Sequence, residues 1–192
     1  MKAKSGSRED EIVAAAGRIF REKGYHATSV RDIGEAVGLL KGSLYHYIRS
    51  KDELLTRLFD GLLEDTVHEL EAIVARGGSP EVKLGAMVRA YAASVMENND
   101  AVGLYLREWR SLPPARLAKL GARRRRMRAL FTQVIADGTR GRSFAVRDPK
   151  IAALAILGSC NWLHEWYRPR GRLSPDAIGD ELAERAVKSV QV

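Results

Sequence analysis

Cys160 and His164 are spaced for nucleophilic chemistry. They stand four residues apart, so on a helix they share one face, where an imidazole base could activate the thiol. The sequence shows neither a group to orient the histidine nor a device to stabilise an oxyanion. No metal-ligand spacing and no phosphate loop is present either. We therefore expect no catalytic residues, no metal site, no cofactor and no enzyme activity.

A run of four arginines, residues 123–126, offers anion binding instead. At 100° per residue the run spans about 300° of a helix circumference, so at least one guanidinium points toward the interior. Arg124 falls on a seam of apolar residues spaced three and four apart. A buried arginine needs an anion, either a carboxylate such as Glu108 or Glu165 or a bound ligand. A solvated arginine face is the alternative.

The positive charge of the chain is concentrated around this run. The 192 residues hold 32 Lys and Arg against 24 Asp and Glu, a formal net charge of +8, which suggests an anionic partner. Residues 107–128 alone carry a net +8, residues 54–106 carry −4, and the remaining segments, 1–53 and 129–192, carry +2 each. The surplus therefore indicates an anionic small molecule or a solvated helix rather than nucleic acid.

The overall composition is that of a folded, water-soluble protein. Hydrophobic residues make up 45% and charged residues 29%, in the globular range. The single cysteine cannot form an internal disulfide and fits a reducing cytoplasm. No apolar stretch approaches the ~18 residues of a membrane span. We expect a cytoplasmic protein with no membrane partner.

Helical spacing runs through nearly every segment and positions these groups. Three capping boxes mark helix starts, in each of which a serine precedes an acidic residue by three positions. They are Ser7 with Asp10, Ser29 with Asp32, and Ser50 with Glu53. Prolines at further starts and glycines at ends divide the rest. The sequence predicts an all-α fold of about nine helices.

Two of the predicted helices are short and adjacent. They cover residues 29–37 and 41–47 and are joined by Gly38-Leu39-Leu40, which is a helix-turn-helix arrangement. Leu44 and Ile48 supply the inward face of the second helix. The glycine and polar residues left at its leading end allow close approach to a major groove. A small helical subdomain that binds no DNA is the alternative.

The residues around these helices resemble the DNA-binding signature of the TetR family of bacterial transcriptional regulators. The similarity covers about Arg8 to Leu55 and rests on residues 24–33, Gly38, residues 42–45 and residues 50–55. It implies that Lys41 and Ser43 face bases beside Gly42, and that Arg31 contacts either bases or phosphates. The implied phosphate contacts are Thr28, Ser29, Tyr45, Tyr47 and Lys51.

Three positions depart from the family's pattern. Leu40 stands where the family usually has a Ser or Thr, so the recognition helix loses a side-chain cap. Tyr47 and Ile48 replace the usual His and Phe. For two of the implied contacts the residues allow another interpretation: Lys51 as a solvated lysine and Tyr45 as a half-buried packing residue.

A second similarity lies near the carboxyl end. Residues 161–169 and 171–174 are similar to a helix end in TetR-type regulators of fatty-acid and steroid degradation, which sense acyl-CoA thioesters; residues 107–109 and 148–149 fit the same pattern. The resemblance implies an aromatic-lined tunnel with arginines for phosphates. The candidate effector-binding residues are Tyr91, Leu104, Trp109, Arg124, Phe131, Trp162, Trp166 and Arg170. Plain core packing and dimer packing are the alternatives.

We expect two domains, a helix-turn-helix domain at residues 1–53 and a helical-bundle domain for ligand binding and dimerisation at residues 54–192. One short recognition helix covers too few base pairs for specificity, so a homodimer on a near-palindromic operator is expected. The interface is predicted on helices at residues 151–167 and 176–188. Its candidate residues are Ala155, Gly158, Ser159, Leu182 and Ala186.

The expected function is a repressor that binds double-stranded operator DNA and is released by a small-molecule effector, with an acyl-CoA thioester as the favoured class. A TetR-type regulator that senses an uncharged drug or lipid, or that activates transcription, is the alternative. The net +2 of residues 1–53 disfavours a protein that coats DNA regardless of sequence.

Overall fold

The structure, a computed structural model, describes residues 7–191, without the side chains of Arg21, Lys41 and Ser111. Throughout that range the chain forms helices, turns and loops and no strand, so the predicted all-α class is confirmed. The helices are α1 (Arg8–Lys23), α2 (Val30–Ala36), α3 (Lys41–Leu44), α4 (Lys51–Ala75), α5 (Pro80–Glu97), α6 (Asn99–Glu108), the short 3₁₀ helix η1 (Trp109–Ser111), α7 (Pro114–Arg140), α8 (Pro149–Asn161), α9 (Leu163–Trp166) and α10 (Pro175–Val190).

The predicted capping boxes form at α1 and α2 and are altered at α4. At the first two helices the serine and the acidic residue each accept from the other's backbone N–H. At α4 the Ser50 hydroxyl accepts from the N–H of Glu53 at 3.2 Å, but the Glu53 carboxylate accepts from the N–H of Arg49 at 2.7 Å. The helix start is therefore capped as predicted, with the reciprocal bond moved by one residue.

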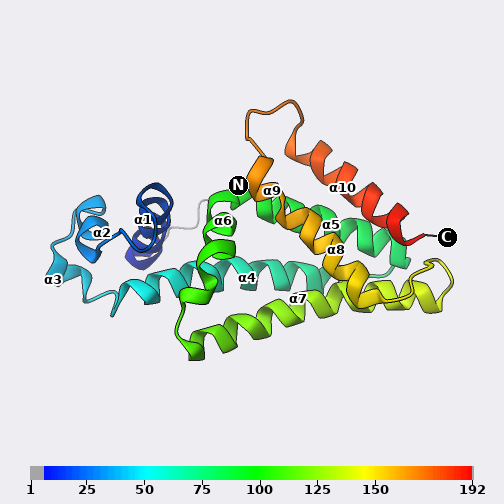
Figure 1. The fold of residues 1–192 in the computed structure, drawn as a ribbon, viewed down its shortest axis with the longest axis horizontal. Coiled ribbons are helices and arrows are strands. Elements are labelled where there is room, and N and C mark those ends of the chain that lie inside the picture. Colours follow the sequence, from blue (N-terminus) through cyan, green and yellow to red (C-terminus); the bar gives the residue numbers. More distant parts are fainter. Residues whose placement is uncertain (1–6, 192) are drawn as a thin grey trace.

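The long helix α4 connects a small amino-terminal group to the rest of the molecule (Figure 1). The group α1–α3 lies at one end, and α4 leads from it into the bundle. There α4 packs along α7, and α5 packs along α10, while α8 contacts both α5 and α7. One helix is thus common to the group that carries the DNA-binding signature and to the larger bundle.

The buried apolar side chains form two clusters. The first cluster joins α1, α2, α3 and the first half of α4, and it also takes in Leu104, Tyr105, Leu112 and Leu120. The second cluster joins the rest of α4 with α5, α7, α8 and α10. The first cluster therefore packs residues of α6 and α7 directly against the amino-terminal group.

Two helices are shorter than their spacing predicts. The helix expected at residues 41–47 ends at Leu44, where the N–H of Tyr47 turns tightly back to the Leu44 carbonyl at 2.9 Å. The helix expected at residues 151–167 divides into α8 and α9. The His164 Nδ1 atom lies 2.6 Å from the Asn161 carbonyl oxygen, which in an unbroken helix would accept from the Glu165 N–H.

Candidate DNA-binding and effector sites

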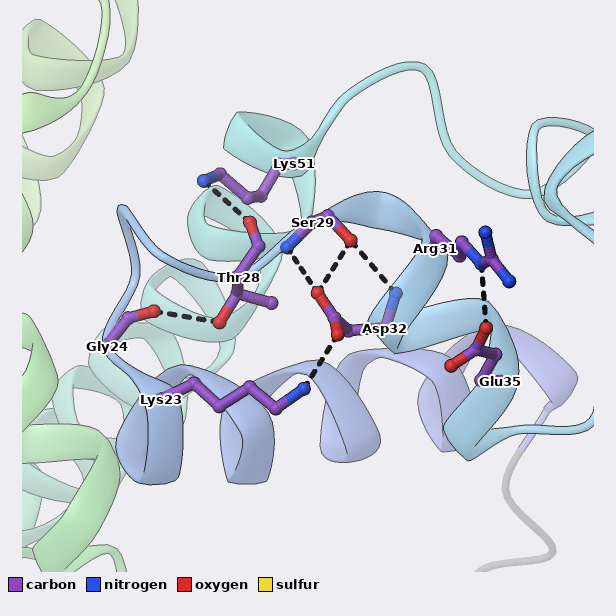
Figure 2. Close-up of polar contacts among 8 residues, drawn as sticks. All are labelled: Lys23, Gly24, Thr28, Ser29, Arg31, Asp32, Glu35 and Lys51. Atoms are coloured by element: carbon purple, nitrogen blue, oxygen red, sulfur yellow. Dashed lines mark hydrogen bonds and ion pairs between the residues drawn. The ribbon is translucent and has the colours of Figure 1, made fainter.

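A compact polar network fixes the start of α2 (Figure 2). The N–H and the hydroxyl of Ser29 both donate to Asp32 Oδ2, at 2.7 and 2.6 Å, and Lys23 Nζ lies 2.7 Å from Asp32 Oδ1. The Lys23 ammonium and the Ser29 bonds hold the pKa of Asp32 far below its ordinary value. Ser29 is exposed at the start of α2, where its hydroxyl caps the helix. Its predicted phosphate contact would use the same exposed hydroxyl.

Lys51 and Thr28 hold the loop that precedes α2 (Figure 2). Lys51 Nζ donates to the carbonyls of Tyr25 and Thr28 at 2.7 and 2.9 Å and lies 4.4 Å from the centre of the Tyr25 ring. Thr28 is buried, and its hydroxyl donates to the Gly24 carbonyl at 2.8 Å. The side chain of Thr28 therefore faces into the loop, and both residues position the loop. Their phosphate contacts stay predictions.

The remaining candidate DNA contacts lie along α2 and around α3. Arg31 is exposed, and its Nε donates to Glu35 Oε1 at 2.8 Å. Gly42 is exposed, with open space where a Cβ atom would stand. Ser43 and Tyr47 are half-buried, and Tyr45 is about half exposed. The side chain of Lys41 lies outside the described residues.

A cavity of about 550 Å³ lies among α4, α5, α6, α7 and α8. Its wall is largely apolar, and it has the size of a typical site for a small organic ligand. The apolar lining consists of Leu62, Leu63, Val95, Val102, Leu106, Trp109, Leu117, Met127, Leu154 and Leu157. None of the described residues that line the cavity is an aspartate or a glutamate. Such a wall suits the hydrophobic part of a ligand.

Arg124 is half-buried at this cavity and stacks on aromatic rings. Its guanidinium carbon lies 4.5 Å from the centre of the Trp109 ring and 5.9 Å from that of Tyr105. The carboxylates named as its possible partners lie against other groups, since Glu108 contacts His26 at 3.3 Å and Glu165 contacts His164 at 3.0 Å. Over the part of the chain that the structure describes, Arg124 forms no ion pair.

Two arginines of the run, Arg123 and Arg126, form ion pairs with acidic residues of α4. Arg123 pairs with Asp60 and Glu64 of α4, and Arg126 pairs with Glu71 of the same helix at 2.6 Å. These acids belong to the segment with net charge −4.

Arg124 and Arg125 of the run line the cavity together with the nearby Arg128, and Arg125 and Arg128 are exposed at its edge. An apolar cavity with three guanidiniums and no acidic lining favours a ligand that is both hydrophobic and anionic.

Two hydrogen-bonded pairs of polar side chains and the Tyr105 hydroxyl stand among the apolar residues of the cavity. The Tyr91 hydroxyl donates to Asn161 Oδ1 at 2.6 Å, and Thr66 Oγ1 lies 2.9 Å from Ser94 Oγ. Burial raises the pKa of Tyr91 and of Tyr105, so both phenols are neutral hydrogen-bond donors near pH 7. The buried Tyr105 hydroxyl has no partner within the described range.

The structure brings only some of the predicted effector residues together. Tyr91, Trp109 and Arg124 line the cavity. Leu104 lies in the first cluster and Phe131 in the second, both fully packed and outside the cavity. Trp162, Trp166 and Arg170 are exposed on the surface of the single chain and do not line it. Helical spacing cannot separate these three environments, because the core, the cavity wall and these exposed positions use the same residue types.

The predicted interface residues lie on α8 and α10. Ala155, Ser159, Leu182 and Ala186 line a shallow groove between the two helices. Gly158 lines the roughly 550 Å³ cavity from α8. The same helix exposes large apolar side chains, namely Ile151, Leu154 and the neighbouring Trp162.

Cys160 and His164 do not form a nucleophilic pair. Burial raises the pKa of the Cys160 thiol to about 12, so it is protonated near pH 7. His164 places Nδ1 at the Asn161 carbonyl and Nε2 at Glu165. Over residues 7–191 the structure shows no group of His, Cys, Asp and Glu side chains arranged for a metal ion. Within that range no helix combines the length and the apolar character of a membrane span.

Comparison with known proteins matches two successive parts of the chain to one family. Residues 12–58 match the bacterial regulatory proteins of the tetR family, and residues 77–190 match the tetracyclin repressor-like C-terminal domain. The HTH-type transcriptional repressor KstR2 of Rhodococcus jostii (strain RHA1) is 32% identical over 180 residues, which cover 93% of this chain and 88% of that protein.

Solved structures agree in fold. The ketosteroid transcriptional regulator KstR2 of Mycobacterium tuberculosis has a TM-score of 0.89 at 26% identity, covering 98% of this chain and 97% of the other. The TetR family regulator PfmR of Thermus thermophilus has a TM-score of 0.87 at 30% identity, covering 93% and 98%. From the matched domains and the length of the similarity, the chain belongs to the TetR family of bacterial transcriptional regulators.

Proposed function

We propose that the chain is a homodimeric repressor that binds operator DNA through α2 and α3 and is released by an acyl-CoA thioester. The cavity carries this proposal. It combines an apolar wall with Arg124, Arg125 and Arg128 and has no acidic lining among the described residues. Few metabolite classes join a long apolar group to several phosphate charges, and CoA thioesters do so.

The two parts of such a ligand match two parts of the cavity. The acyl group is suited to the apolar wall of the roughly 550 Å³ cavity, where its burial drives binding. The phosphates are suited to the edge, where Arg125 and Arg128 are exposed to solvent and the guanidinium of Arg124 has no carboxylate partner among the described residues. A relative named as a ketosteroid regulator supports a bulky apolar acyl group.

Helix α6 connects the cavity to the DNA-binding group. Tyr105 lines the cavity and also packs in the first cluster, with its ring centre 5.0 Å from that of Phe59. At the end of the helix Glu108 contacts His26, which lies in the loop before α2. A ligand that moves Tyr105 or Trp109 therefore shifts α6 against α1 and this loop. A preference of a few kcal/mol between the two arrangements is enough to release DNA.

The proposed dimer uses the exposed apolar face of α8 together with α10. Ile151 and Trp162 stand on that face, and Ala155 and Ser159 allow close approach of a second helix. Leu154 is half exposed and also lines the cavity. The effector thus touches the helix that sets the distance between the two recognition helices of the dimer.

The test is release of DNA from the intact protein. An operator duplex is selected from random sequences with the purified protein, and its binding is followed by fluorescence anisotropy. Lauroyl-CoA and lithocholoyl-CoA are titrated as long-chain and steroid probes, with free CoA as the control. We expect at least one thioester to release the operator and free CoA to have no effect. Unchanged DNA binding at saturating concentrations of both thioesters contradicts the sensing part of the proposal.

An uncharged hydrophobic effector is the second candidate, because most of the cavity lining is apolar. It is distinguished by the matching S-acyl-pantetheine, which keeps the thioester and removes the phosphates of CoA. Release by the pantetheine thioester at the same concentration as by the CoA thioester favours this second candidate.

A further inference from the structure

Leu40 is the most exposed large apolar side chain that the structure describes, at 81% of its full accessible surface. The neighbouring Leu39 is half-buried and packs against the first cluster, and its N–H donates to the Gly34 carbonyl at 2.8 Å. The turn between α2 and α3 therefore directs one leucine inward and the next outward. Packing in the protein core therefore does not explain why an apolar residue stands at position 40.

Dimer packing does not account for Leu40 either. In the carboxyl half of the chain, the most exposed large apolar side chains lie on or next to α8. They are Ile151, Leu154 and Trp162. Leu40 lies directly before α3, and Figure 1 places α3 at the end of the molecule opposite α8 and α10. In the family to which the chain belongs, this end carries the DNA-binding domain.

The position of Leu40 favours a hydrogen-bonding residue. The Leu40 carbonyl accepts from the Leu44 N–H at 3.0 Å, so Leu40 stands at the N-cap of α3, where Ser, Thr, Asp or Asn would satisfy a free N–H. A leucine side chain cannot cap the helix and cannot bind a phosphate. Covering this exposed side chain with an apolar surface in the DNA complex is favourable.

Duplex DNA presents one apolar group in the major groove, the C5 methyl of thymine. Gly42, two residues further along, has no heavy atom within 4 Å of the place of a Cβ atom, so no side chain at that residue separates the turn from a base pair. We infer that Leu40 packs on a thymine methyl in each operator half-site and specifies thymine there. This inference rests on the proposed contact of α3 with DNA and is independent of the effector.

The test removes only the methyl group from the DNA. In an operator selected against the full-length protein, each thymine is replaced in turn by uracil, symmetrically in both half-sites, and affinity is measured without effector. Burial of one methyl group corresponds to about a fourfold change in affinity, so two half-sites give about sixteenfold. We expect the affinity of the parent chain to fall by this factor when uracil replaces one symmetrical pair of thymines. In Leu40→Ala the same replacement lowers the affinity by less than about twofold.

Two further variants keep the result interpretable. Leu40→Ser restores a capping hydroxyl, so it melts at or above the temperature of the parent chain and is equally insensitive to the uracil replacement. Val82→Ala changes another exposed apolar residue, on α5, and retains the full uracil effect. A uracil effect that persists in both Leu40 variants, or the absence of any thymine pair with such an effect, overturns the inference. Failure of acyl-CoA to release the operator would leave this test unaffected.

Discussion

Lys51 near the DNA-binding helices and Arg124 at the cavity are both cations that lie over an aromatic ring, at 4.4 Å from the ring centre of Tyr25 and 4.5 Å from that of Trp109. They differ in what else they contact. Lys51 donates to backbone carbonyls at 2.7 and 2.9 Å, whereas Arg124 forms no ion pair with any residue in the described part of the chain.

Under the proposed function, this difference distinguishes a cation that supports the loop from one that is free to bind a ligand. The hydrogen bonds of Lys51 are satisfied within the protein, so it holds the loop before α2 in place. The guanidinium of Arg124 is half-buried and stacks on Trp109, and we propose that the anionic part of the ligand pairs with it. The same distinction holds within the arginine run, where Arg123 and Arg126 are neutralised by α4 and Arg124 is not.

The largest expected effect comes from Leu104, which the sequence assigned to the cavity and the structure places in the first cluster. Leu104→Ala removes a fully buried side chain and lowers the free energy of unfolding by about 2–5 kcal/mol. Affinity for the acyl-CoA thioester changes little, because Leu104 does not line the cavity. Leu106→Ala changes a residue of the same helix that does line the cavity. It lowers the affinity for the thioester more, and the free energy of unfolding less, than Leu104→Ala does. Denaturant unfolding and ligand titration of both variants measure the contrast.

The next effect concerns the arginine run itself. Arg124→Gln removes a charge-assisted contact worth about 1.5–3 kcal/mol, so the concentration of acyl-CoA that releases DNA rises about 10- to 160-fold. Arg126→Gln is the matched control, because that arginine already pairs with Glu71, and it leaves the release concentration within about twofold. Equal shifts in the two variants would mean that the run acts only through its total charge.

Lys51 provides a smaller test on the DNA side. Lys51→Met leaves the Tyr25 and Thr28 carbonyls without their donor, at a cost of about 1–2 kcal/mol. We expect a melting temperature lower by about 3–6 °C and weaker binding to all DNA sequences alike. Ser43→Ala, in contrast, changes sequence preference. If Lys51→Met leaves the melting temperature unchanged and reduces the salt dependence of DNA binding, Lys51 is a phosphate ligand and not a support of the loop.

The smallest effect is the pH dependence that Asp32 gives to α2. Its pKa is lower in the folded protein than its ordinary value of 3.8, so this stabilisation is present above that pH and is lost as the pH falls below it. Asp32→Asn therefore lowers the melting temperature near pH 7, and its difference from the parent chain narrows below about pH 4. Thermal melts at several pH values check this, and a constant difference at every pH would contradict it.

The helix starts and the DNA-binding group could be predicted from the sequence because their signals are local. Ser29 and Asp32 are three residues apart, and Gly38 adopts a positive φ of 66° at the turn after α2. Both features depend on neighbours in the chain, so a single sequence contains them.

The cavity could be predicted only in part, because its members are chosen by packing between distant segments. Phe131 and Trp109 look alike in spacing, but only Trp109 lines the cavity. The separation of Arg123 from Arg124 depends on Asp60, and hence on the packing of α4 along α7. The acidic residues spaced along α4 are the one sequence signal for these ion pairs. They identify the paired arginines only when the packing of α4 against α7 is known.

The most direct test of the account is the preference of the cavity for the phosphates of its ligand. The dissociation constants of the acyl-CoA that releases DNA and of the matching S-acyl-pantetheine are measured by calorimetry on the parent chain and on Arg124→Gln. We predict that the parent chain binds the CoA thioester at least about tenfold more tightly and that Arg124→Gln loses most of this preference. Equal affinity of the parent chain for the two thioesters, or a preference unchanged in the variant, would contradict the account.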